Sequence, residues 1–250
     1  MLVQALHKTT ELILGLYDDF REFISPSACL CCGRIRDFED PLLCPGCVSS
    51  LRTKCIGQGP VCPYCGRPDG VLTTCARCDS ATHLKLYFWG FYDAELQTCI
   101  LQFKFHKARA LGLRLVDMAM HSMADSLTSQ RYDLIIPVPL HKSRVREREY
   151  NQSEVLSERL AISLNIDHQP GALVRHKHTR QQAKLEEQER WTNVRDAFEL
   201  CDEHRHLISG KRILLVDDIV TTGATIYEAS RPLLAAEATA VDIFSLAYAK

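Results

Sequence analysis

The sequence predicts an α/β protein in which a doubly wound parallel sheet follows a small cysteine-rich module. Three observations support this class. Strand-like and helical segments alternate after residue 83. One of them, residues 213–216, is an unbroken apolar run of the kind that is covered on both faces. Before residue 83, cysteines recur in close pairs. A chain of 250 residues has room for one medium domain and one small domain.

The alternating segments occupy residues 83–250, which we expect to form one domain. Residues 86–92 are apolar and aromatic and predict a strand with a bend at Gly90. Apolar side chains recur at helical spacing over residues 95–105, 111–127 and 153–164. Two further apolar runs, residues 133–140 and 241–247, predict buried strands, and Gly210 ends the connection into residues 213–216.

Residues 1–24 are expected to form an amphipathic helix, because their apolar side chains recur at helical spacing. This helix packs on its own protein or offers a surface to a partner or a membrane interface. Asp18, Asp19 and Glu22 lie where a signal peptide would have its cleavage region. The chain has no apolar run long enough for a membrane span, so we expect a cytoplasmic protein. The net charge of −1 excludes a global basic field that would attract nucleic acid.

Cysteine chemistry dominates residues 25–82, which we expect to form a double zinc ribbon. Ten of the 12 cysteines lie there, and eight of them form four Cys-x-x-Cys pairs. The pairs are Cys29/Cys32, Cys44/Cys47, Cys62/Cys65 and Cys75/Cys78. Two such pairs supply the four thiolates of a structural zinc site, which has no open position for catalysis. The eight cysteines therefore fit two structural zinc ions.

The pairing of these ligands is left open by the sequence. The first two pairs can share one ion and the last two the other, or the pairing can be crossed. Cys31 and Cys55 are surplus, and Cys31 could replace Cys29. Redox chemistry is the alternative, because Cys-x-x-Cys is also the thioredoxin motif, but four copies outside a βαβ context favour zinc. Basic and acidic residues are mixed in this segment, so a scaffold or protein contact is as good an expectation as DNA contact.

The stretch after residues 213–216 combines groups that suit a ribose phosphate. Asp217 and Asp218 lie at the carboxyl end of the predicted strand, where open α/β sheets place their ligands. The following loop and helix start offer hydroxyl and backbone N–H groups to a phosphate. These groups belong to Thr221, Thr222, Gly223, Ala224 and Thr225. An acidic pair before a glycine could instead simply close the strand and cap the helix, but two carboxylates there are costly unless something binds them.

This pattern resembles that of the type I phosphoribosyltransferases, whose substrate is phosphoribosyl pyrophosphate. The resemblance implies that Asp217 and Asp218 hold the ribose hydroxyls as the catalytic pair and that Mg²⁺ bridges pyrophosphate and ribose oxygens. It also places pyrophosphate at the turn that contains Pro137 and Val138. Basic side chains suit this anion, and we expect contacts from Lys104, Arg144 and Arg148. The polar residues 175–198 are expected to form a lid that excludes water.

Nearly the whole chain resembles the ComF family (ComFC/GntX-like proteins), which is linked to natural competence. Three segments carry the resemblance besides the cysteine pairs, namely residues 101–105, 137–140 and 217–225. A fourth, residues 148–152, departs from it, because Glu149 stands where the family has glycine. Glu149 could weaken anion binding or pair with Arg148. Further matches through the predicted lid are Thr179, Gln182, Leu185, Arg190, Asn193, Ala197 and Phe198.

The resemblance implies a protein that binds phosphoribosyl pyrophosphate or a nucleotide 5-phosphate and acts in DNA uptake. Three roles remain open. The protein could transfer phosphoribose to an unknown acceptor. It could be a non-catalytic nucleotide sensor or single-stranded DNA-binding protein that works with the competence machinery. It could also be a nucleobase-salvage enzyme, although a zinc ribbon is unusual there.

Overall fold

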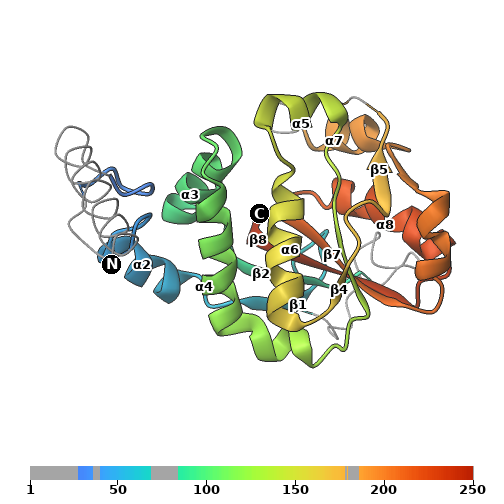
Figure 1. The fold of residues 1–250 in the computed structure, drawn as a ribbon, viewed down its shortest axis with the longest axis horizontal. Helices are drawn as coiled ribbons and strands as arrows, with labels where there is room; N and C mark the ends of the chain where they lie inside the picture. The colour runs from blue at the N-terminus through green and yellow to red at the C-terminus, as the bar shows by residue number, and fades with distance from the viewer. Residues whose placement is uncertain (1–27, 36–39, 69–83, 178, 180–185, 250) are drawn as a thin grey trace, which may run out of the picture. The chain divides into compact units, whose positions relative to one another are not determined.

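Six strands form one sheet in the order β1-β2-β8-β7-β3-β4 (Figure 1). β1 runs antiparallel to β2, whereas all the other neighbouring strands are parallel. The strands are β1 (Gln58–Val61), β2 (Leu86–Phe91), β3 (Leu134–Pro137), β4 (Asp167–His168), β7 (Arg212–Val220) and β8 (Ala240–Tyr248). The predicted α/β class with a mostly parallel sheet is therefore confirmed.

The structure is a computed structural model that describes residues 28–35, 40–68, 84–177, 179 and 186–249. The helix predicted for residues 1–24 lies outside these residues, as do Cys75 and Cys78. The chain divides into two compact units, Met1–Ser50 and Leu51–Lys250. Helix α2 (Pro45–Lys54) spans this division, and β1 belongs to the second unit. The predicted domain boundary between residues 82 and 83 remains a prediction.

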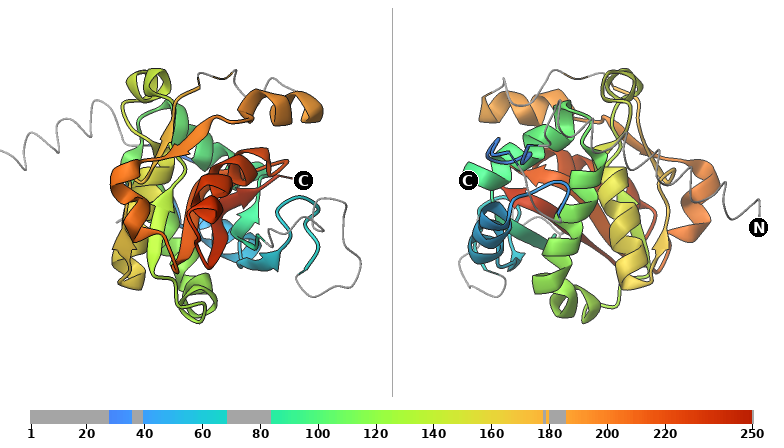
Figure 2. Two further views of the ribbon diagram at one scale, coloured as in Figure 1. Left: turned by 90° about the vertical axis from the view of Figure 1, so that its right-hand side faces the viewer. Right: turned by 60° about the vertical axis from the view of Figure 1, so that its left-hand side comes forward.

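Helices cover both faces of the sheet in the second unit. α4 (Arg109–Thr128) and α6 (Gln152–Leu164) lie side by side over one face, and α8 (Ala224–Ala235) packs on the other (Figures 1 and 2). α3 (Ala94–Phe105) packs against α4, and a Cβ atom at Gly112 would lie 2.4 Å from the Phe103 ring. This close approach requires glycine. Among the described helices, none has both the length and the hydropathy that a membrane span needs.

Strand β7 is longer than predicted. Residues 213–216 are fully buried, as expected, but the strand continues to Val220 instead of ending before Asp217. The reason is the neighbouring β8, whose Ser245, Ala247 and Tyr248 pair with residues 217, 219 and 220. On its other side β3 ends at Pro137, which pairs with Val216. The acidic pair therefore lies on a strand end that has a partner on one side only.

Residues 173–207 form a separate small layer that follows β4. β5 (Leu173–Arg175) pairs with β6 (Phe198–Leu200) in a two-stranded antiparallel sheet. Between them lies α7 (Glu187–Val194), and after them comes the 3₁₀-helix η2 (Asp202–Leu207). α7 and β6 both pack on α8. The predicted lid region is thus partly regular structure, and its residues 178 and 180–185 lie outside the described part.

Helix α5 (Lys142–Arg148) ends at Glu149, which has a left-handed backbone with a φ of 72°. A glycine fits this conformation best, which explains why the resemblance calls for glycine here. The Glu149 carboxylate forms an exposed ion pair with Lys107, so the alternative of a pair with Arg148 is not what the structure contains.

We predict that Glu149→Gly stabilises the protein, because it relieves the left-handed strain of about 1 kcal/mol. The lost surface ion pair should offset less than that. Thermal unfolding should show a rise of roughly 2–4 °C in Tm. Glu149→Ala is the matched control, since it removes the same ion pair but keeps a Cβ atom. Equal stability of the two variants would show that the backbone is not strained.

Candidate functional site

Four cysteine sulfurs of the first unit meet in one cluster. The Sγ atoms of Cys29, Cys32, Cys44 and Cys47 all lie within 4.8 Å of one another. Cys32 and Cys44 are 3.8 Å apart, close to the sulfur separation of about 3.8 Å that tetrahedral zinc–thiolate bonds impose. The backbone N–H of Cys44 also donates to Cys29 Sγ at 3.3 Å. This cluster can hold one zinc ion, it joins the first two pairs, and it contains Cys29 rather than Cys31.

The Cys62/Cys65 pair has the same backbone turn as Cys29/Cys32. In each turn the first cysteine N–H donates to an arginine carbonyl five residues later, at 2.8 Å in both cases. Gly33 and Gly66 follow with φ of 72° and 69°, a conformation that favours glycine. A second zinc ion remains a prediction, because Cys75 and Cys78 are outside the described residues. Cys55 is a buried core residue whose Sγ would lie 2.5 Å from a Cβ at Gly90.

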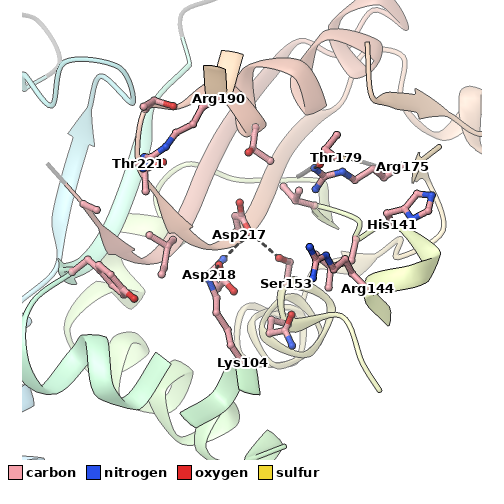
Figure 3. Close-up of a pocket in the computed structure, with 18 of the residues that line it drawn as sticks. Lys104, His141, Arg144, Ser153, Arg175, Thr179, Arg190, Asp217, Asp218 and Thr221 are labelled. Atoms are coloured by element: carbon pink, nitrogen blue, oxygen red, sulfur yellow. Dashed lines mark hydrogen bonds and ion pairs between the residues drawn. The ribbon is translucent and has the colours of Figure 1, made fainter. Parts of the chain in front are cut away.

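The second unit contains a cavity of about 820 Å³ at the carboxyl ends of β3 and β7 (Figure 3). The chain proceeds from β3 outward to β4 and from β7 outward to β8 on the opposite side. A crevice at such a switch point is where open α/β sheets bind ligands. Of the predicted site residues, those that line it are Lys104, Val138, Arg144, Arg148, Asp217, Asp218, Thr221, Thr222 and Thr225. Pro137, Gly223 and Ala224, which were also predicted, are not among the lining residues.

The two carboxylates have different partners. Asp217 Oδ1 accepts hydrogen bonds from Ser153 Oγ and from the backbone N–H of Asp218, both at 2.9 Å. Asp218 Oδ1 forms an ion pair with Lys104 Nζ at 2.9 Å, and both side chains are largely buried. Lys104, predicted as a pyrophosphate contact, therefore reaches the site from α3 beside the acidic pair (Figure 3).

Burial and the neighbouring Asp218 change the ionisation of Asp217. Burial and the charge of Asp218 raise the pKa of Asp217 from 3.8 to about 7, although Lys104 and Ser153 act in the opposite direction. The folded protein therefore holds a proton on Asp217 at pH values where the unfolded chain has lost it. A cation or a set of ligand hydroxyl donors would favour the ionised form.

The predicted phosphate loop leads directly into α8. Gly223 is the residue before the helix and has a φ of 77°. A Cβ there would lie 2.7 Å from the Tyr64 ring and 3.1 Å from the Pro63 carbonyl, so the loop fits closely against the turn between Cys62 and Cys65. With Thr221, Thr222 and Thr225 on the cavity, this helix start can donate N–H and hydroxyl groups to an anion.

The basic wall of the cavity comes from α5. Arg144 pairs with Glu147 at 2.6 Å, within its own helix. The Arg148 guanidinium lies 5.0 Å from the centre of the Phe105 ring, and its Nη1 donates to Gln152 Oε1 at 2.8 Å. Both arginines line the cavity, and Figure 3 shows Arg144 beside His141.

Buried hydrogen bonds tie the turn after β3 to the acidic pair. Asn151 Nδ2 donates to the Val138 carbonyl at 3.1 Å, and Asn151 Oδ1 accepts from the Ser153 N–H at 3.2 Å. Ser153 then donates to Asp217, so the start of α6 fixes both walls of the cavity. Asn151 belongs to the family-like segment 148–152, whereas no sequence pattern indicates a role for Ser153, whose partner is 64 residues away.

Other cavity residues also escaped the sequence analysis. Arg175 and Thr179 line the cavity, with Arg175 Nη2 donating to Thr179 Oγ1. Tyr64 lines it as well and contacts the rings of Trp191 and Tyr227, with centroid distances of 6.0 and 6.2 Å. A signal existed for Thr179, which falls in the family pattern, but none pointed Tyr64 from a cysteine-rich turn toward the ligand cavity.

Comparison with known proteins gives consistent results. The family model described as "Phosphoribosyl transferase domain" matches residues 137–250. Competence protein F of Haemophilus influenzae is 30% identical over 83% of this chain and 90% of its own length. Competence protein ComFC of Bacillus subtilis is 28% identical, over 83% and 84%. DNA utilization protein YhgH of Escherichia coli K12 is 30% identical, over 82% and 89%.

We predict that Asp217→Asn stabilises the unliganded protein at pH 8 but much less at pH 5. Because the folded pKa of Asp217 is raised, wild-type stability should be highest below the unfolded pKa and should fall as the pH rises toward about 7. The variant should lack this fall, with a gain on the order of 2 kcal/mol at pH 8 after allowance for partial exposure. Denaturant titrations at pH 5 and pH 8 measure the free energy of unfolding. The control variant is Asp202→Asn, at a side chain that is exposed. Parallel pH profiles of wild type and Asp217→Asn would contradict the assignment.

We also predict that Cys29→Ser lowers the zinc content of the purified protein by about one ion per chain. Cys31→Ser is the matched control and should leave the zinc content unchanged, because Cys31 is not among the four clustered sulfurs. Elemental analysis of the two purified variants measures their zinc content and shows whether Cys29 or Cys31 is the ligand. Zinc loss in the Cys31 variant with retention in the Cys29 variant would reverse the ligand assignment.

Proposed function

The chain belongs to the ComF family of competence proteins, and we propose that it binds phosphoribosyl pyrophosphate or a nucleotide 5-phosphate in the cavity at β3 and β7. The observation that carries this proposal is the shared cavity of the acidic pair and the start of α8. The carboxylates of Asp217 and Asp218 suit hydroxyl donors, and the helix start suits a phosphate. A ribose 5-phosphate presents both groups in one small molecule.

Each end of the ligand then has chemically matched partners. Thr221, Thr222 and Thr225 would hold the 5-phosphate, with Gly223 and Ala224 supplying backbone N–H groups. The turn of Pro137 and Val138 would hold the pyrophosphate. Arg144 and Arg148 would help to neutralise it, since both line the same cavity.

Lys104 would have two roles. Its ion pair with Asp218 supports a role in positioning that carboxylate, and it would contact pyrophosphate, as predicted from the sequence, once a ligand competes for the carboxylate. Mg²⁺ prefers oxygen ligands, so carboxylate, pyrophosphate and ribose oxygens fit it, and it would supply further positive charge to the leaving group. The clustered thiolates would hold structural zinc.

If the protein transfers phosphoribose, the bond between ribose C1 and pyrophosphate breaks, and its electron pair leaves with pyrophosphate. The acceptor then bonds to C1 and gives up a proton. A cationic sugar at this stage is wasted if water reaches it, so the layer of β5, β6 and α7 would serve to exclude water. A role in DNA uptake is supported by the competence and DNA-utilization names of the relatives.

We predict that Asp217→Ala combined with Asp218→Ala removes binding of phosphoribosyl pyrophosphate with Mg²⁺, measured by calorimetry, while the fold persists. The loss should be at least about 100-fold, since two sets of charge-assisted hydrogen bonds are removed. Asp202→Ala combined with Glu203→Ala removes the same charge from an exposed helix and should bind like wild type. Undiminished affinity in the first double variant would rule out the assigned role.

Exchange of label between pyrophosphate and phosphoribosyl pyrophosphate, with a panel of bases, tests turnover. Exchange with any base supports a transferase. No exchange, together with single-strand binding that weakens steeply with salt, would favour the DNA-contact role instead. The observation behind that second role is Phe105, which is 52% exposed beside the Arg148 guanidinium and can stack on a base.

A further inference from the structure

Arg175 is a cation at the ligand cavity that forms no ion pair with a described residue. Its guanidinium donates one hydrogen bond to Thr179 Oγ1, while its buried Nε has no partner among the described residues. The charge of the Asp217 carboxylate acts favourably on it, but no ion pair joins the two residues. A guanidinium that is largely shielded from water without an ion pair is costly, so its surroundings favour a ligand that brings more negative charge.

The protein holds this guanidinium in place by packing. It lies 5.2 Å from the centre of the Phe198 ring, a contact that joins the adjacent strands β5 and β6. Thr179 is itself only 8% exposed, so the hydrogen bond is shielded too. Burial lowers the pKa of Arg175, the charge of Asp217 raises it, and the charge of Arg144 lowers it. Stacking and hydrogen bonding therefore orient a cation that forms no ion pair with a described residue.

The position of Arg175 relative to the acidic pair indicates which anion it would meet. Arg175 and Arg144 come from β5 and α5, and in Figure 3 both lie on one side of Asp217, whereas Thr221 of the phosphate loop lies on the other. A ribose held by Asp217 and Asp218 would thus have its 5-phosphate at one end and these two cations at the other. Two guanidiniums from different elements are suited to adjacent phosphate groups, which offer several oxygens for bidentate hydrogen bonds.

We propose that Arg175 is a pyrophosphate-binding residue that contacts the leaving group from β5, on the same side of Asp217 as Arg144 of α5. This inference rests on the proposed function. It adds a residue that the sequence placed only in a polar lid, and it makes the layer of β5 and β6 a direct part of the ligand site. The group that Arg175 would recognise is a diphosphate anion, which can be free pyrophosphate or the diphosphate attached to ribose.

The test is calorimetry with three separate probes in the presence of Mg²⁺, namely phosphoribosyl pyrophosphate, inorganic pyrophosphate and ribose 5-phosphate. Arg175→Gln should weaken binding of the first two by about 10- to 100-fold, the loss expected for charge-assisted hydrogen bonds. Ribose 5-phosphate lacks the diphosphate, so its affinity should change by less than about twofold. Arg195→Gln, an exposed arginine outside the cavity, is the matched control and should bind all three probes as wild type does.

Two further measurements separate recognition from structure. Arg175→Lys keeps the charge without the bidentate fork, so it should recover part of the pyrophosphate affinity. Arg175→Gln should also raise the Tm of the unliganded protein, because it removes an uncompensated charge. Equal loss for ribose 5-phosphate would make Arg175 a merely structural residue, and unchanged pyrophosphate affinity would overturn the proposal. A wild type that binds none of the probes would overturn the proposed function as well.

Discussion

Repulsion between the adjacent carboxylates of Asp217 and Asp218 is the constraint on which the rest of the cavity depends. Two like charges at the sparsely paired end of β7 are stable only if other groups supply donors or positive charge. α3 provides Lys104 and α6 provides Ser153, each 2.9 Å from a carboxylate oxygen. The acidic pair therefore requires α3 and α6 to lie where Lys104 and Ser153 reach the carboxylates, in addition to what packing requires of these helices.

The same cavity contains two kinds of unbalanced charge. The negative charge of the acidic pair is incompletely neutralised. Arg175, which lines the same cavity, forms no ion pair with any described residue. A folded protein that retains such features gives up stability at a site where a ligand can restore it. A ligand with hydroxyls in the middle and anions at both ends would satisfy the carboxylates, the guanidiniums and the start of α8 together.

The cysteine-rich segment is also more closely integrated than a separate ribbon would be. Its residues 58–61 form an edge strand of the main sheet, and the turn between Cys62 and Cys65 fits against Gly223 so tightly that a methyl group has no room. Tyr64 then links that turn to α7 and α8 through Trp191 and Tyr227. This turn therefore packs directly against the residue that precedes α8.

The sequence by itself determined the α/β class, the motif of residues 217–225 and the cysteine pairs, because hydrophobic periodicity and motif spacing are local properties of the chain. It could not determine that β7 extends to Val220, because that depends on pairing with β8. Nor could it bring Ser153 to Asp217 or Arg175 to Phe198, since these contacts join residues 64 and 23 positions apart and arise only when strands and helices pack. Local patterns specify which elements form, whereas tertiary packing alone decides which distant side chains share one low-dielectric cavity.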